Sequence, residues 1–378
     1  MRGAVAATAQ LLAREDSVQP PDWSSEWLQL DDPAAMLDRI RRHKLAIAVL
    51  PIAASLPLTD QQRSDLAASA RAHRMRSLAV AADQVAAVRA LAEEGVRVIS
   101  LKGLAFAAQT TGDFGARVAG DIDLLVDPAD VAAATAALQR AGVRLDTEYC
   151  PSPESPLFAA TRRSLKASLL HTAHTDLDLH WRLDVSAKCC AAPFDELWSR
   201  SVVVDVGGQP VRTLGVVDAA IFCASHGTTD HWSRLRQVVD QVRIDRLAPE
   251  PRVAPAAQGM GAHLRYQVAR AVVAPVVGAT PVVGRRARAV AASAWRSLAA
   301  GHDVRTGTEA SAVSRRLVVQ LGAAYDTPVA TAERLLSAGW PVQDMGARRL
   351  GAFGDRAPGL YLVWGIARAP ARLREKLA

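Results

Sequence analysis

Two aspartates separated by one residue stand at the start of the segment GDIDLLV, residues 120–126. The segment predicts a β-strand over 121–126, in which residues i and i+2 share one face about 7 Å apart. Asp121 and Asp123 are therefore expected side by side. Two carboxylates this close repel each other unless a cation lies between them. Mg²⁺ suits such a pair because it prefers oxygen ligands and completes its shell with water and phosphate oxygens. For this motif alone, the alternative is a polar strand face with two solvated aspartates.

A second acidic segment, DLDLHW at residues 176–181, alternates in the same way. Asp176, Asp178 and His180 are expected on one face of a strand, with the apolar residues on the other. If this strand lies beside residues 121–126, Asp178 completes a cluster of three carboxylates, although Asp176 is an alternative third member. Such a cluster serves two-metal phosphoryl transfer, in which one metal ion holds a triphosphate and the other activates the attacking hydroxyl. An amphipathic edge strand is the alternative interpretation.

A lysine and a glycine, Lys102-Gly103, stand where a predicted strand over 96–101 runs into a predicted helix over 103–111. Glycine lets the backbone approach a phosphate, and a helix N-terminus offers free N–H groups. Lys102 adds a positive charge, and Arg117 lies four residues before Asp121, within reach of the same phosphates. Alternatively, the turn only connects the strand to the helix, and Arg117 is an ordinary surface residue.

Together these residues resemble the nucleotidyltransferase superfamily with the DNA-polymerase-β-type core, and within it a bacterial branch of uncharacterised nucleotidyltransferases. Lys102-Gly103 matches the Leu-Lys-Gly turn of that branch, and Arg117 matches an arginine before the acidic strand. Asp121 and Asp123 match the metal-binding pair, and Asp178 falls in the acidic-Leu-His-Trp signature. The resemblance covers about residues 95–245, with a looser similarity in the C-terminal YLVWGIARAPARLRE.

The resemblance implies a Mg²⁺-dependent transfer of a nucleoside monophosphate from a nucleoside triphosphate, with ATP as the expected donor, to a hydroxyl acceptor. Pyrophosphate leaves. Lys102, Gly103 and Arg117 are then expected to hold the triphosphate, and Asp121, Asp123 and Asp178 to be the catalytic, metal-binding residues. The expected acceptor is a hydroxyl-bearing small molecule or natural product. RNA, in the manner of nucleotidyltransferase toxins, and a non-catalytic nucleotide-binding role are the alternatives.

A later group of residues also follows the pattern of this branch. It comprises Asp218, His226, Trp232, Leu235 and Asp240. His226 is a candidate for lining a substrate pocket, with a backbone-bonded residue at a helix end as the alternative. Asp240 is expected to pair with Arg236 or Arg243 of its own predicted helix.

The elements that must position these residues follow from the surrounding sequence. An antiparallel pair is predicted over 164–171 and 176–182, and a hairpin over 202–206 and 211–214. Apolar residues at helical spacing dominate elsewhere. We therefore expect an α/β (α+β) nucleotidyltransferase core with a mixed sheet at residues 95–215, flanked by helical regions at 1–94 and 216–378.

Composition bounds the class of protein. Of the 378 residues, 50% are hydrophobic and 22% charged, and the net charge of +7 permits an anionic partner. No apolar run reaches the ~20 residues that a membrane-spanning helix needs, so no membrane insertion is expected. The four cysteines are too few for a disulfide framework, and the N-terminus shows no signal peptide, so a cytoplasmic protein is expected.

Overall fold

A mixed sheet of seven strands forms the centre of the computed structural model, which describes residues 2–30, 32–147, 150–155, 158, 162, 165–300 and 325–338. The strands follow the order β3-β4-β5-β2-β1-β7-β6. Their bounds are Val98–Ser100 (β1), Asp121–Val126 (β2), Arg144–Leu145 (β3), Ala167–His171 (β4), Asp176–His180 (β5), Val202–Val206 (β6) and Gln209–Thr213 (β7). The α/β class with a mixed sheet is as expected from the sequence.

Local patterns located most of these strands correctly. β2 has the bounds predicted for it, and β4 and β5 form the predicted antiparallel pair. β6 and β7 form the predicted hairpin around Gly207 and Gly208, both of which have positive φ. The turn therefore has the backbone that favours glycine at both central positions.

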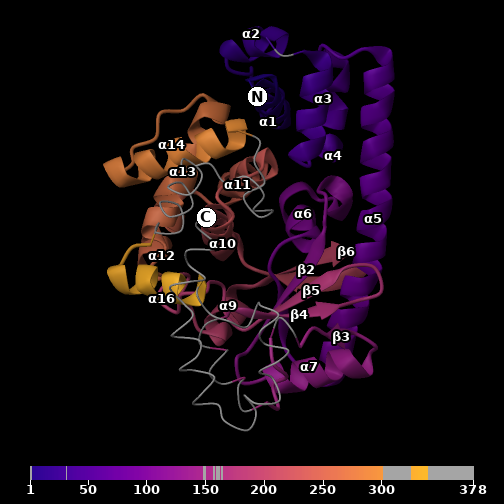
Figure 1. The fold of residues 1–378 in the computed structure, drawn as a ribbon, viewed down its shortest axis with the longest axis vertical. Coiled ribbons are helices and arrows are strands. Elements are labelled where there is room, and N and C mark those ends of the chain that lie inside the picture. The colour runs from indigo at the N-terminus through magenta and orange to yellow at the C-terminus, as the bar shows by residue number, and fades with distance from the viewer. Residues whose placement is uncertain are drawn as a thin grey trace.

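Helices surround the sheet and form the rest of the described fold (Figure 1). Before the sheet lie α1 (Arg2–Glu15), α2 (Trp23–Leu30), α3 (Pro33–Arg42), α4 (Ala46–Val49) and α5 (Asp60–Glu93). Between strands lie α6 (Leu104–Thr111), α7 (Val131–Arg140) and α9 (Phe194–Arg200). After the sheet follow α10 (Val216–Thr229), α11 (Leu235–Leu247), α12 (Glu250–Gly259), α13 (His263–Val277), α14 (Arg285–Ala300) and α16 (Pro328–Ala338).

Each face of the sheet has its own apolar core. Ile122 and Leu177 belong to one cluster together with residues of α5 and α7, including Leu91 and Leu138. Ile99, Leu125 and Phe106 belong to a second cluster, which includes residues of α1, α10, α11 and α13. The polar face of β2 and β5 therefore points away from α5 and α7, toward the helices of the second cluster.

The second core joins helices from the two ends of the described chain. Arg243 and Arg246 of α11 form ion pairs with Glu15 at the end of α1. α5, whose 34 residues begin beside the N-terminal helices, extends down to the sheet (Figure 1). The division of the chain into three regions at residues 94/95 and 215/216 stays a prediction. The two apolar cores cross these boundaries, since α5 contributes to the core of the sheet and α1 packs with the later helices.

Much of the predicted C-terminal region lies outside the described residues, namely 301–324 and 339–378, and with it YLVWGIARAPARLRE. Among the residues that the structure does describe, no helix combines the length and apolar character needed to cross a bilayer.

Candidate active site

The two acidic strands lie side by side. β2 and β5 pair in parallel, with Asp121 opposite Asp176, Asp123 opposite Asp178 and Leu125 opposite His180. Residues directly opposite each other in neighbouring strands share a face of the sheet. All four aspartates therefore lie on one face, as the hypothesis of a carboxylate cluster requires.

Three buried or half-buried side chains converge closely enough to hold a metal ion. One ligand atom from each of Asp123, Asp178 and His180 lies within 4.8 Å of the others. His180 Nε2 lies 3.1 Å from Asp123 Oδ1, and its buried Nδ1 has no hydrogen-bond partner among the described residues. Burial and the neighbouring charge of Asp123 raise the pKa of Asp178. The residues fit a divalent cation, because a metal ion would relieve this uncompensated negative charge.

The ammonium group of Lys102 lies between the carboxylates of Asp121 and Asp123. Its Nζ is 3.2 Å from Asp121 Oδ2 and 3.2 Å from Asp123 Oδ2. Lys102 lowers the pKa of Asp121 most strongly among its neighbours. Burial opposes ionisation of Asp123, but Lys102 and the hydrogen bond with His180 hold its pKa well below the usual range. Although burial disfavours its charged form, the two carboxylates raise the pKa of Lys102.

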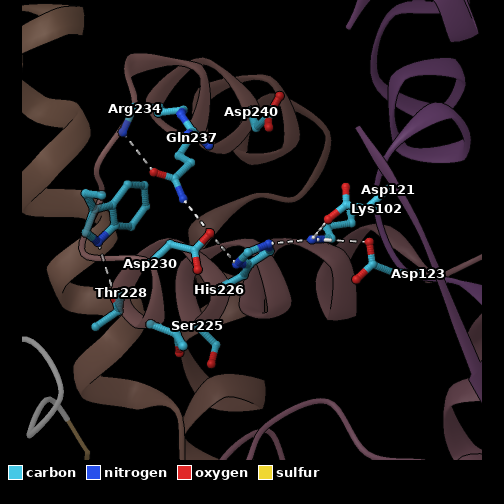
Figure 2. A network of polar contacts seen from close by, with 12 residues as sticks. Lys102, Asp121, Asp123, Ser225, His226, Thr228, Asp230, Arg234, Gln237 and Asp240 are labelled. Atoms are coloured by element: carbon cyan, nitrogen blue, oxygen red, sulfur yellow. Dashed lines mark hydrogen bonds and ion pairs between the residues drawn. The ribbon is translucent and has the colours of Figure 1, made fainter. Parts of the chain in front are cut away.

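A chain of side chains behind Lys102 fixes this arrangement (Figure 2). Lys102 Nζ is 2.9 Å from His226 Nε2, and His226 Nδ1 is 3.3 Å from Asp230 Oδ2. Burial lowers the pKa of His226 to about 4, so its ring is neutral near pH 7. The ring therefore accepts from the ammonium at Nε2, and its remaining proton lies at Nδ1, facing Asp230.

The chain continues into the start of α11. Gln237 donates to Asp230 Oδ2 over 3.3 Å, and Gln237 Oε1 accepts from the backbone N–H of Arg234, the N-cap residue of that helix, over 3.1 Å. The loop between α10 and α11 thus holds His226 against Lys102.

Gly103 gives the β1–α6 turn a backbone that other residues rarely adopt. It is the N-cap of α6, with φ 72° and ψ −129°. A Cβ atom there would lie 3.6 Å from the backbone oxygen of Asp121, so the turn passes close to the start of β2. This close approach orients Lys102 toward the carboxylates.

Arg117 and Asp240 form a buried ion pair with each other. Arg117 Nε lies 2.9 Å from Asp240 Oδ2. The prediction that Asp240 pairs with an arginine of its own helix is wrong, because Arg236 donates to the backbone oxygen of Val118 and Arg243 pairs with Glu15. Since Arg117 is engaged with Asp240, its expected role at the triphosphate stays a prediction.

Lys44, between α3 and α4, is a further cation near the carboxylates that the sequence did not single out. A Cβ atom at Gly120 would lie 3.6 Å from its Nζ. The backbone φ of Lys44 is 56°, in the left-handed region. Burial, Arg236 and Arg234 lower the pKa of Lys44 to about 8, while Asp121 acts in the opposite direction.

Lys44, Arg117 and Arg236 line one small cavity with Asp240. Its volume of about 10 Å³ would hold no more than one water molecule. Positive charge thus collects beside Asp121, whose pKa Arg117 and Arg236 both lower.

Lys44, which sequence reasoning missed, left little signal in the sequence. Lys44 is one of only five lysines in an arginine-rich chain, which is the one feature that distinguishes it. His180 shares the face of the acidic strand, and His226 was a candidate only through the family pattern. Asp176 is separated from the cluster, because its carboxylate is 2.8 Å from His171 Nδ1.

Comparison with known proteins identifies the family of the chain. The model of a family described as uncharacterised nucleotidyltransferase matches residues 30–252, more than half of the chain. No curated protein and no solved structure matches the chain. The matched region contains β2, β5, Lys102 and Lys44. The chain therefore belongs to the uncharacterised nucleotidyltransferase family.

Proposed function

We propose that this protein transfers a nucleoside monophosphate from a nucleoside triphosphate to the hydroxyl group of a small molecule, with a divalent metal ion such as Mg²⁺. The sheet then serves as the nucleotidyltransferase core. The observation that carries the proposal is the in-register pairing of Asp123 with Asp178, which brings them together with His180. Like charges held close together cost stability, so a site without catalytic function would not be expected to keep them.

In this proposal the three carboxylates have different roles. Asp123 and Asp178 hold the metal ion, and Asp121 lies next to it on the same strand face. When bound, the metal ion neutralises charge on the phosphates and acidifies the attacking hydroxyl. The hydroxyl oxygen attacks the α-phosphorus, the bond to the β-phosphate breaks and pyrophosphate leaves. Asp178, which forms no ion pair with Lys102 in the described structure, orients the hydroxyl and takes its proton.

Positive side chains next to Asp121 are suited to the triphosphate. Lys44 and Arg236 form no ion pair with a carboxylate of any described residue, whereas Arg117 is neutralised by Asp240. Burying such charges without a paired carboxylate is costly, and an anionic ligand would offset that cost. We therefore assign Lys44 and Arg236 to the phosphates, with the backbone at Gly103 close by. ATP remains the expected donor.

Thermal unfolding with each of the four nucleoside triphosphates, with and without Mg²⁺, tests the proposal. A ligand that binds only the native state stabilises it by about 2.7 kcal/mol at 100 times its Kd. We expect a Mg²⁺-dependent rise in Tm for at least one triphosphate. The rise should disappear in the Asp121→Asn/Asp123→Asn variant.

Asp176→Asn is the matched control, since Asp176 lies on the same strand face but is 60% exposed and bound to His171. This variant should keep the rise. If no triphosphate changes the Tm in the presence of Mg²⁺, the proposal is contradicted. A rise that does not need Mg²⁺ would favour the non-catalytic nucleotide-binding alternative.

A further inference from the structure

The position between Asp121 and Asp123 already holds a cation that belongs to the protein. The Lys102 ammonium donates a hydrogen bond to Asp121 and forms an ion pair with Asp123, each at 3.2 Å. Repulsion between two neighbouring carboxylates is thereby relieved without a metal ion. The sequence alone suggested that a metal would lie here and that Lys102 would turn toward the phosphates.

The ammonium is anchored as a permanent part of the site. A third contact, 2.9 Å to His226 Nε2, holds it from the side opposite the carboxylates (Figure 2). His226 is in turn held by Asp230, and Asp230 by Gln237. The side chain of Lys102 is only 13% exposed. To leave, the ammonium would have to give up its contacts with two carboxylates and the His226 imidazole at once.

The charges of the site leave room for one divalent ion. Asp121, Asp123 and Asp178 carry three negative charges when ionised, and Lys102 supplies one positive charge. The remaining two are matched by a single divalent cation, and the group of side chains that could hold it, Asp123, Asp178 and His180, does not include Asp121, which contacts Lys102.

We propose that the site binds one divalent metal ion, on Asp123, Asp178 and His180, and that Lys102 takes the place of a second metal ion between Asp121 and Asp123. Lysine suits this role because its ammonium is a compact point charge. The inference rests on the proposed function but concerns the number of metal ions, which that function leaves open.

Metal stoichiometry tests the inference without measuring activity. The full chain is dialysed to equilibrium against Mn²⁺ and the α,β-methylene analogue of the triphosphate that raises its Tm. Manganese and nucleotide per chain are then quantified. We expect one Mn²⁺ per bound nucleotide in the wild type and two in Lys102→Met, because that variant vacates the position between the two aspartates.

Lys188→Met, which removes an exposed lysine, is the matched control and should still bind one Mn²⁺. Two Mn²⁺ per nucleotide in the wild type would overturn the inference, and this result does not depend on the folding of any variant. A folded Lys102→Met variant that still binds one Mn²⁺ would also overturn it. If the wild type binds nucleotide with no Mn²⁺, or binds neither, it is the proposed function that fails.

Discussion

At the scale of single residues, the site is a set of charges that fix one another. Asp123 is buried and stays ionised because Lys102 and His180 contact it directly. Asp178 lies beside it without an ion pair to Lys102, and its pKa is raised. Neighbouring carboxylates whose pKa values are shifted in opposite directions are a feature of sites that combine charge stabilisation with proton transfer. The environments of these side chains therefore support different roles for them.

Lys44 provides a test at this scale. We expect Lys44→Met to weaken binding of the Mg²⁺–triphosphate complex by about 10- to 150-fold, since a hydrogen bond to a charged group contributes about 1.5–3 kcal/mol. Isothermal titration of the wild type and the variant measures the change. The variant should not be less stable than the wild type, because Lys44 is half-buried beside Arg234 and Arg236. Unchanged affinity, equal to that of the exposed Lys188→Met control, would remove Lys44 from the phosphate site.

At the scale of elements, the turn between β1 and α6 positions Lys102. Leu101 donates its backbone N–H to the backbone oxygen of Asp123 over 3.0 Å, which holds the end of β1 against β2. Gly103 then reverses the chain into α6 with a backbone that favours glycine. The turn therefore places Lys102 directly over the start of β2, where both carboxylates begin.

Gly103→Ala tests this role of the turn. We expect the free energy of unfolding to fall by about 1–3 kcal/mol, because a non-glycine residue is strained at this φ and ψ. Urea denaturation measures the loss. Gly259→Ala, at the end of α12 with ordinary φ and nothing within 4 Å of the added Cβ, should be neutral or stabilising by up to about 1 kcal/mol. Equal effects of the two substitutions would show that the Gly103 turn carries no special constraint.

At the scale of the whole molecule, the polar face of the sheet is enclosed by helices from distant parts of the chain. α10 supplies His226, α11 supplies Arg236 and the segment between α3 and α4 supplies Lys44. Packing of α1 and α13 with α11 holds these helices in one core. The site therefore depends on the integrity of this helical layer as well as on the sheet.

Asp245 of α11 makes the stability of this layer depend on pH. Burial raises its pKa to about 7, while Gln241 and Arg270 act in the opposite direction. The folded state therefore binds this proton more tightly than the unfolded state, and its stabilising contribution is lost as pH rises from about 4 through 7. Each tenfold difference in proton affinity between the two states corresponds to about 1.4 kcal/mol of stability.

Asp245→Asn should remove this pH dependence. We expect the variant to unfold at a higher temperature than the wild type at pH 8, and to differ little from it at about pH 3, where Asp245 is protonated in both the folded and the unfolded state. Thermal unfolding across this range measures the difference, with Asp22→Asn as the exposed control. A higher unfolding temperature for the wild type than for Asp245→Asn at pH 8 would contradict the raised pKa of Asp245.

Local sequence patterns were enough to define the elements of the site. Alternation located β2 and β5, and it placed Asp121 with Asp123 and Asp178 with His180, because side chains two apart in a strand share a face whatever surrounds them. Gly103 and Gly112 likewise mark the two ends of α6 where the sequence predicts them. These features depend on backbone geometry between close neighbours, which the chain carries locally.

Long-range packing, in contrast, selected which groups meet. The parallel register of β2 and β5 brings Asp178 next to Asp123, whereas the carboxylate of Asp176 contacts His171. His226, 124 residues after Lys102, contacts the ammonium of that lysine. Arg117 pairs with Asp240 across 123 residues, against the expectation of a pair within one helix. Such contacts follow from the tertiary structure and from competition among many charges for few buried partners, and no local pattern in the chain encodes them.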